Sequence, residues 1–373
     1  MKEKIKTLSI DLETYSSIDL KKSGVYPYAE SDDFEILLFA YSINEGEVQV
    51  IDIACGEKVP IEILNALVDN GITKWAYNCQ FERVCLSYWL KEHYPTIFKG
   101  YGDKYDTVEN YLDPVSWKCS RIWGAYMGLP LSLKGIGAVL KLDNQKMEEG
   151  SDLIKYFCTP CRPTKKNGGR TRNLPIHNKE KWELFKKYNK RDVEVELAIK
   201  ERLSKYPVPD FVWDEYHIDQ TINDRGIGVD MCLVKNAISI DEKTKSLLLT
   251  ELKERTGLSN PNSVIQMKEW LSQNGIDTDV LDKKAVSTLI SSSERHISEV
   301  LLCRQQLAKS SVKKYSAMEN MICKDHRARG CFMFYGASRS GRWAGRGIQL
   351  QNLPQNHMPD LEEARNLVLD NNY

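Results

Sequence analysis

The stretch from Thr7 to Thr14 is the feature that most limits what this chain can fold into. Apolar and polar residues alternate along it with the two-residue period of a half-buried strand. Because side chains two positions apart on a strand point the same way, Asp11 and Glu13 project together from the polar face. Adjacent carboxylates repel one another unless a cation lies between them, and hard cations such as Mg²⁺ prefer oxygen ligands. The sequence therefore predicts a first strand that carries a pair of metal-binding acids.

The Asp-x-Glu pattern is weak evidence by itself, since it recurs at 33–35, 192–194 and 360–362. A solvated surface pair is the commoner meaning of such a pattern, because charged residues are frequent in globular proteins. Asp11 and Glu13 are set apart by their place on the first strand and by the partners that follow along the chain.

Composition places the chain among ordinary globular proteins. A length of 373 residues indicates two or three domains. The formal net charge is zero, so nucleic-acid binding depends on local clusters of basic residues. No apolar run is long enough to span a membrane, and the N-terminus lacks a signal-peptide pattern. We therefore expect a cytosolic protein whose ten cysteines are reduced thiols.

Further strands and helices are expected around the first strand. The runs at 35–43 and 48–52 read as strands that complete an antiparallel meander with it. A helix over 60–70 and a short strand over 73–77 follow, and 117–150 reads as two amphipathic helices. This order predicts an α/β fold, a mixed sheet flanked by helices.

A second candidate acid lies where the strand over 73–77 gives way to a helix. Asn78 is a good N-cap residue for that helix, and Glu82 falls in its first turn. The helix dipole favours a carboxylate there, so a capped helix explains the pattern without any further function. The alternative is that Glu82 is a third acid facing the metals.

A third candidate segment is the strongly helical stretch from Lys179 to Arg202. Tyr188 and Asp192 lie four residues apart on one face of it. A phenolic hydroxyl and a carboxylate together can bind a metal and orient a water molecule. A buried tyrosine beside a surface aspartate is the alternative.

Residues 153–179 contain no acid and seven lysines and arginines, with glycines and prolines that favour a flexible loop. The run is either a solvated loop or a loop that holds a nucleic-acid backbone. Cys158 and Cys161 in this loop have zinc-ligand spacing, but the chain has no second Cys-x-x-Cys. His177 is a third candidate ligand and nothing nominates a fourth, so a plain loop is the preferred interpretation.

Taken together, the three acidic segments resemble the motifs of the DEDDy 3′–5′ exonucleases, the proofreading domains of DNA polymerases. The resemblance covers about residues 5–205, with one departure: the second motif usually ends in Asp and here ends in Glu82. It implies a ribonuclease H-like fold and two Mg²⁺ (or Mn²⁺) ions. By this resemblance Asp11 bridges both ions, Glu13 and Asp192 complete the first site, and Glu82 supports the second through water.

The same resemblance implies roles for three other residues. Tyr188 orients the attacking water, while Asn78 and Phe81 position the terminal nucleotide. The expected reaction is in-line hydrolysis of the last phosphodiester, which releases a 5′-nucleoside monophosphate. Readout of base sequence is not expected, because stacking and phosphate contacts serve any base.

The stretch from 331 to 354 carries a second resemblance. Gly341-Arg342-Trp343 followed by Gln349-Leu350-Gln351-Asn352-Leu353-Pro354 resembles family A DNA polymerases, most closely the phage and prophage branch. It implies that Arg342, Gln351 and Asn352 contact primer–template DNA near the palm. The alternative is a basic, glycine-rich turn. Residues 304–346 hold ten lysines and arginines against two acids, which favours contact with a phosphate backbone.

These observations predict three parts: an exonuclease domain over 1–205, a mostly helical thumb-like DNA-binding region over 206–330, and an incomplete beginning of a palm over 331–373. The polymerase carboxylates of the family come later than Tyr373, so this chain by itself is not expected to polymerise.

The leading hypothesis is therefore the N-terminal portion of a family A DNA polymerase. It would act as a monomer on single-stranded 3′ ends and primer–template in the host cytoplasm, with a missing polymerase half or replication proteins as further partners. A free-standing single-strand-specific exonuclease and a non-enzymatic DNA-binding module are the alternatives.

Overall fold

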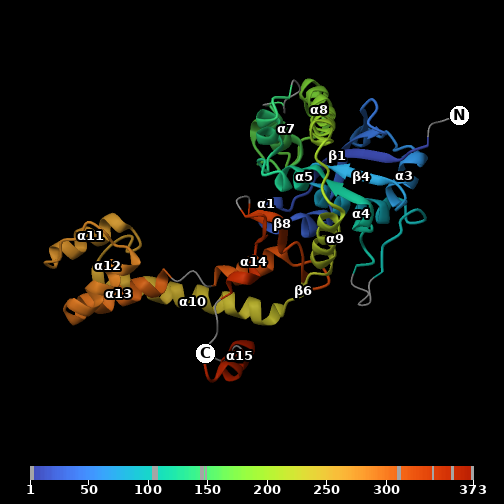
Figure 1. Ribbon diagram of the computed structural model, residues 1–373. Coiled ribbons are helices and arrows are strands. Elements are labelled where there is room, and N and C mark those ends of the chain that lie inside the picture. The colour runs from blue at the N-terminus through green and yellow to red at the C-terminus, as the bar shows by residue number, and fades with distance from the viewer. Residues whose placement is uncertain are drawn as a thin grey trace. The chain divides into compact units, whose positions relative to one another are not determined.

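A computed structural model describes residues 4–102, 108–142, 147, 149–308, 312–337, 340–353 and 357–370. The described chain forms two compact units (Figure 1). The first comprises Met1–Val229 with Asn320–Pro354, and the second comprises Asp230–Glu319 with Gln355–Tyr373. The predicted boundaries after 205 and 330 are functional divisions and stay predictions.

The first unit is built on a five-stranded mixed sheet in the order β3-β2-β1-β4-β5. The antiparallel part consists of β1 (Thr7–Tyr15), β2 (Glu35–Ile43) and β3 (Gln49–Asp52), as the meander predicted. On the other side of β1, the strands β4 (Thr73–Ala76) and β5 (Trp117–Cys119) run parallel to it. The predicted α/β fold with a mixed sheet is confirmed.

Strand β1 is buried on both faces, not half-buried as its alternation predicted, because it occupies the middle of the sheet and has helices on both sides. Helices α4 (Cys79–His93) and α8 (Lys179–Leu203) both pack on the sheet. The apolar side chains of β1 join a core with Val84, Cys85 and Leu86 of α4. The polar side chains of β1 contact α8.

Shorter helices complete the sheet domain. They are α1 (Leu20–Ser23), α2 (Val25–Ala29), α3 (Ile61–Val68), α5 (Ser120–Tyr126), α6 (Leu133–Val139) and α7 (Gly150–Phe157). The helical expectation for 117–150 was wrong at its start, where Trp117–Cys119 is the edge strand β5. Three residues are too few for hydrophobic periodicity to distinguish a strand from a helix.

The C-terminal part of the first unit packs on the sheet domain through α9 (Asp210–Arg225). Strands β6 (Ile227–Gly228) and β7 (Arg327–Ala328) pair antiparallel, as do β8 (Phe332–Ala337) and β9 (Arg342–Gly345). Strand β8 contacts α5 and α9. This packing brings residues of the second family resemblance into the same unit as the acids.

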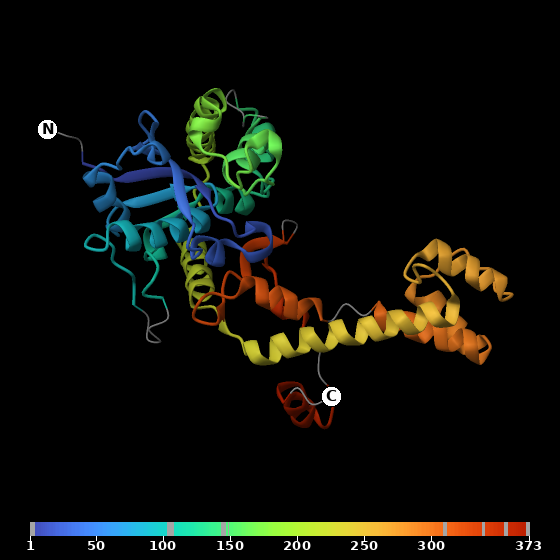
Figure 2. The same ribbon diagram turned by 180° about the vertical axis from the view of Figure 1, so that it is seen from behind.

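The second unit is helical, as expected (Figure 2). Its longest element is α10 (Met231–Thr256), which the Asp230 side chain caps by accepting from two backbone amides. Helices α11 (Val264–Gln273), α12 (Lys283–Ser292) and α13 (Arg295–Leu307) share one apolar core with Leu252 of α10. The unit also contains most of α14 (Lys313–Met321) and all of α15 (Leu361–Leu369), which lies against α10. Among the described residues, no helix is long and apolar enough to cross a membrane.

Candidate active site

The polar face of β1 meets one face of α8, and this contact brings the first and third acidic segments together. Asn189 donates from Nδ2 to Asp11 Oδ2 at 2.7 Å and to the Asp11 carbonyl at 3.2 Å. Two residues earlier on β1, Ser9 accepts from Lys200 Nζ at 3.1 Å. A β-bulge lies directly after Glu13, and such bulges re-aim neighbouring side chains. The hydrogen bonds from Asn189 of α8 therefore fix the position of Asp11 on β1.

Tyr188 lies among the acids and is almost fully buried. Its hydroxyl is hydrogen-bonded to Asp192. Burial raises the pKa of Tyr188 far above its ordinary value, and the nearby carboxylates of Asp192, Glu13 and Asp11 raise it further. The hydroxyl therefore stays protonated at neutral pH, so it can form hydrogen bonds but does not act as a phenolate base.

Glu82 stands in the first turn of α4, as the sequence predicted, and it is buried with 5 % exposure. Burial raises the pKa of this carboxyl well above its ordinary value, and the charge of Asp11 raises it further. Among the described residues, its Oε2 atom has no hydrogen-bond partner. A buried carboxylate oxygen without a partner is costly unless a cation or a water molecule reaches it.

The acids have the chemistry of a divalent-metal site, since carboxylate oxygens are the preferred ligands of Mg²⁺ and Mn²⁺. The orphaned Oε2 of Glu82 fits such a role. Within the described residues, however, no three His, Cys, Asp or Glu side chains converge closely enough to hold one ion as they stand. An ion bound here would require carboxylate side chains to turn toward it.

Asn78 directly precedes α4, and Phe81 lies in its first turn. Asn78 occupies the N-cap position, but its side chain makes no capping hydrogen bond. Both residues line a cavity of about 350 Å³ together with Gln80 and Arg346. The structure therefore places these two predicted substrate-binding residues at a common cavity.

The other three predicted DNA contacts are exposed. Arg342 begins β9, and Gln351 and Asn352 lie in the short 3₁₀ helix Leu350–Asn352. No described contact joins them to the acids. Pro354 of the quoted motif lies outside the described residues, as do Ser338 and Arg339 just before the motif.

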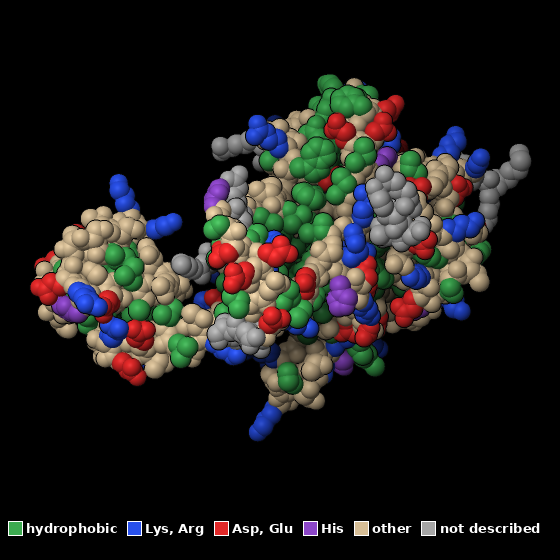
Figure 3. Space-filling model, turned by 90° about the horizontal axis from the view of Figure 1, so that it is seen from below, with side chains coloured by type: hydrophobic (Ala, Val, Ile, Leu, Met, Phe, Trp, Pro, Cys, Tyr) green, Lys and Arg blue, Asp and Glu red, His purple; other side chains and the backbone are tan. Residues whose placement is uncertain are grey.

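The basic segment is partly helical, since α7 extends to Phe157. Arg172 forms a two-bond ion pair with Glu35 and stacks on Tyr15, 3.7 Å from the ring centre. Cys158 lies with its Sγ 3.8 Å from Glu13 Oε2, whereas Cys161 contacts the Arg170 carbonyl. Figure 3 shows basic and acidic side chains interspersed over the face seen from below.

Three residues at the site were not predicted from the sequence. Asn189 holds Asp11, and Cys158 lies beside Glu13. Gly150 packs against the ring of Tyr188, where an added Cβ would lie 2.2 Å from Cε2. For Asn189, its position directly after Tyr188 on α8 could have indicated a place at the site. Nothing local in the sequence indicates the other two.

Comparison with known proteins finds a relative that is similar to this chain. A DNA polymerase of Bacillus phage SP02 is 47 % identical to it over 370 residues, which is 99 % of this chain. The chain is thus similar to a phage DNA polymerase along almost its whole length. It covers 54 % of that relative and so spans about half of its length. No protein-family model matches the chain.

A solved structure shares the fold of this chain. It is the POL domain of Pol1 from M. smegmatis, in complex with DNA primer-template and dNTP. The TM-score is 0.51 at 14 % identity, over 94 % of this chain and 52 % of that one. At this identity the likeness shows the fold alone.

Proposed function

We propose that the chain carries the 3′–5′ proofreading exonuclease of a family A DNA polymerase, which removes 3′-terminal nucleotides from DNA. The observation that carries the proposal is the meeting of three distant segments: Asp11 with Glu13, Glu82, and Tyr188 with Asp192. Burial raises the pKa of Glu82 and of Tyr188, and the charges of acids from the other segments raise both further. The strand order with a central β1 supports a ribonuclease H-like domain over 1–205.

Asp11, Glu13, Glu82 and Asp192 are the residues that would hold two Mg²⁺ or Mn²⁺ ions. Bound there, the ions would stabilise the attacking and leaving oxygens and lower the pKa of the attacking water. The buried, unpartnered oxygen of Glu82 supports this assignment. Asn189 would keep Asp11 oriented through the hydrogen bond that it already makes.

Tyr188 would orient the attacking water. Its hydroxyl, which is hydrogen-bonded to Asp192, can hold a water by hydrogen bonding. Removal of a correctly placed hydrogen-bonding group of this kind typically costs about 10²-fold to 10⁴-fold in rate when proton transfer depends on it. Asn78 and Phe81 would position the terminal nucleotide from the adjacent cavity.

The polymerase relative extends the proposal to DNA replication or repair in a bacterial host cytoplasm, with single-stranded 3′ ends and primer–template as substrates. In this proposal the helical region acts as a thumb, and the stretch from 331 onward begins a palm with Arg342, Gln351 and Asn352 on DNA. Monomeric action and partnership with replication proteins belong to the same proposal.

Digestion of a 5′-labelled single-stranded oligonucleotide with Mg²⁺ tests the exonuclease. The chain is compared with Asp11→Ala and with Asp360→Ala, which makes the same change in another Asp-x-Glu pair, at an exposed residue. We expect a ladder that shortens from the 3′ end with the unchanged chain and with Asp360→Ala, and none with Asp11→Ala. A ladder that survives Asp11→Ala, or none from the unchanged chain, contradicts the proposal.

A further inference from the structure

The cavity beside α4 has the composition of an anion site. Its basic residues are Lys21 and Lys22 of α1 and Arg346, which follows β9, and no acid lines it. Both lysines are exposed, and no described ion pair neutralises them. A cavity of about 350 Å³ with three cations and no carboxylate concentrates positive potential on one small space.

Gln80 provides an independent indication of a ligand. Its side chain lines the cavity and is 8 % exposed. Among the described residues, the amide Nε2 has no hydrogen-bond partner, while Oε1 lies 3.5 Å from Arg346 Nη1. A buried donor without an acceptor costs free energy, and an anionic oxygen in the cavity would satisfy it.

Arg346 shows the same deficit. Its Nη2 lies against the sulfur of Met333, a weak acceptor, and among the described residues its Nη1 makes the long contact with Gln80. Burial lowers the pKa of Arg346 despite the opposing charge of Asp219. A guanidinium recognises phosphate by paired hydrogen bonds, so the planar fork of Arg346 is suited to an anion of that class.

The other residues that line the cavity suit the parts of a nucleotide other than its phosphate. Phe81 offers an aromatic ring, and Asn78 offers an amide that makes no capping hydrogen bond to α4. Gly347 shapes the opposite side, where a Cβ would lie 1.8 Å from the sulfur of Met321. The cavity therefore combines a stacking surface with phosphate-binding groups, the pairing that single-strand binding uses.

We propose that this cavity binds a nucleotide phosphate, with Arg346, Lys22 and Gln80 as its ligands. The phosphate comes either from the backbone of single-stranded DNA or from a free 5′-nucleotide, because the same groups recognise both. The inference rests on the proposed function and deepens it, since it assigns Arg346 of the segment after β9 to substrate binding at the cavity that Asn78 and Phe81 line.

Binding measured in EDTA tests the inference without hydrolysis. Anisotropy of a labelled oligothymidylate and calorimetry with thymidine 5′-monophosphate are carried out on the full chain and on Arg346→Met and Lys22→Met. Arg202→Met is the matched control, since it removes an exposed arginine that lines no part of the cavity. Weakening of about tenfold by Arg346→Met and by Lys22→Met, with Arg202→Met within about twofold, supports the site.

The two probes identify the source of the phosphate. If the cavity variants weaken binding of the oligonucleotide alone, the cavity binds the backbone of a strand. If they weaken binding of both probes, the cavity binds a nucleotide. Binding of both probes within about twofold of the unchanged chain, in both cavity variants, overturns the inference. A melting temperature of Arg346→Met at or above that of the unchanged chain is expected, because a poorly paired, half-buried cation is removed.

The Mg²⁺ digestion of the same variants separates this inference from the proposed function. If the cavity variants bind both probes as the unchanged chain does and the digestion gives a normal ladder, the cavity site is overturned and the exonuclease proposal stands. Weakened binding by the cavity variants, with no ladder from the unchanged chain, retains the cavity site and overturns the exonuclease.

Discussion

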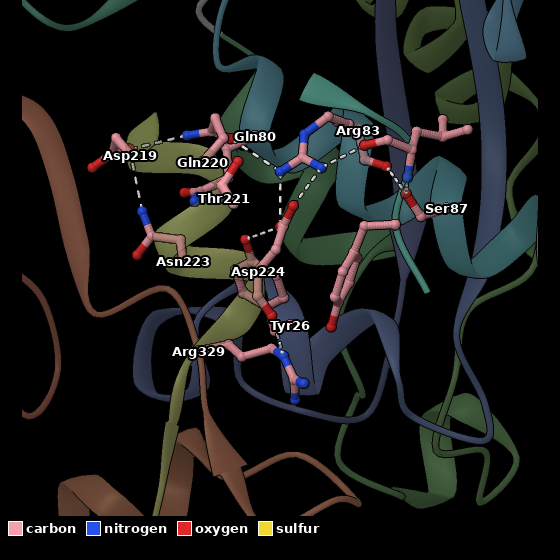
Figure 4. Close-up of polar contacts among 12 residues, drawn as sticks. Tyr26, Gln80, Arg83, Ser87, Asp219, Gln220, Thr221, Asn223, Asp224 and Arg329 are labelled. Atoms are coloured by element: carbon pink, nitrogen blue, oxygen red, sulfur yellow. Dashed lines mark hydrogen bonds and ion pairs between the residues drawn. The ribbon is translucent and has the colours of Figure 1, made fainter. Parts of the chain in front are cut away.

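Arg83 of α4 and Asp224 of α9 form a two-bond ion pair at 2.8 Å with no solvent exposure of either side chain. The hydroxyl of Tyr26 also donates to Asp224, and Arg329 donates to its backbone carbonyl (Figure 4). Arg83 directly follows Glu82, so this pair fixes the start of α4 against α9. The acid at the site is thus anchored by a contact that spans 141 residues of sequence.

Replacement of Asp224 by alanine should lower the free energy of unfolding by about 3–5 kcal/mol, because the Arg83 guanidinium would be left buried without its partner. Urea unfolding followed by circular dichroism measures the change. The double variant Arg83→Met/Asp224→Leu should recover part of the loss, since it removes both charges. Arg295→Ala is the control, at a side chain that is 93 % exposed and pairs with Glu299 on the surface. An Asp224→Ala chain as stable as this control would contradict the anchoring role.

The burial of Lys74 predicts that replacing this residue changes the stability of the protein by an amount that depends on pH. The residue is fully buried with its Nζ 2.7 Å from the Asp69 carbonyl, and burial lowers its pKa from 10.5 to about 8. Because the folded state releases this proton at lower pH than the unfolded state, the lysine's contribution to stability rises between about pH 8 and 10.5.

Lys74→Met should therefore be more stable than the unchanged chain at pH 7, by about 1–3 kcal/mol, and should lose that advantage by pH 10. Denaturant midpoints across this range measure it. Lys58→Met removes an exposed lysine and should show no such pH-dependent difference. An advantage that is constant with pH would refute the explanation by protonation.

We expect the protonation of Asp219 to make the stability of the β9 region depend on pH in the mildly acidic range. It accepts from Trp343 Nε1 at 2.8 Å, and burial raises its pKa from 3.8 to about 6. The folded state therefore binds this proton more tightly than the unfolded state, so the residue's contribution to stability falls as pH rises from about 4 to 6.

Tryptophan fluorescence should report this titration, with a transition near pH 6 that depends on Asp219 and Trp343. Asp219→Asn and Trp343→Phe should each remove it. A transition that persists in both variants would assign the titration to another group.

Gly150 is expected to be a positioning residue for Tyr188. An alanine at this place would put its Cβ 2.2 Å from Cε2 and 2.7 Å from Cζ of the tyrosine ring, so the ring must move. Since displacement by about 1 Å can cost about 10²-fold in rate, Gly150→Ala should reduce exonuclease kcat about tenfold or more with little change in KM.

Gly137→Ala is the matched control, because the nearest atom to its added Cβ is 3.9 Å away. Single-turnover digestion measures both variants, and circular dichroism checks that both are folded. Equal rates for the two alanine variants would show that the ring of Tyr188 does not require the glycine.

Local patterns predicted much of the secondary structure. Alternation identified β1, and helix formers identified α8 within two residues of its ends. These signals depend on neighbours within a few positions, which is why they can be read from a single sequence. The edge strand β5 was missed because it is too short to carry a period.

The sequence by itself determined the fold class, the acidic face of β1, and the positions of Glu82, Tyr188 and Asp192 on their helices. Only the tertiary structure decided which side chains support them: Asn189 on Asp11, Gly150 against Tyr188, and Asp224 against Arg83. It also placed Arg346 beside Gln80, across 266 residues of sequence. The physical reason is that periodicity and capping are local, whereas these partners meet through packing of elements far apart in the chain, which no local pattern encodes.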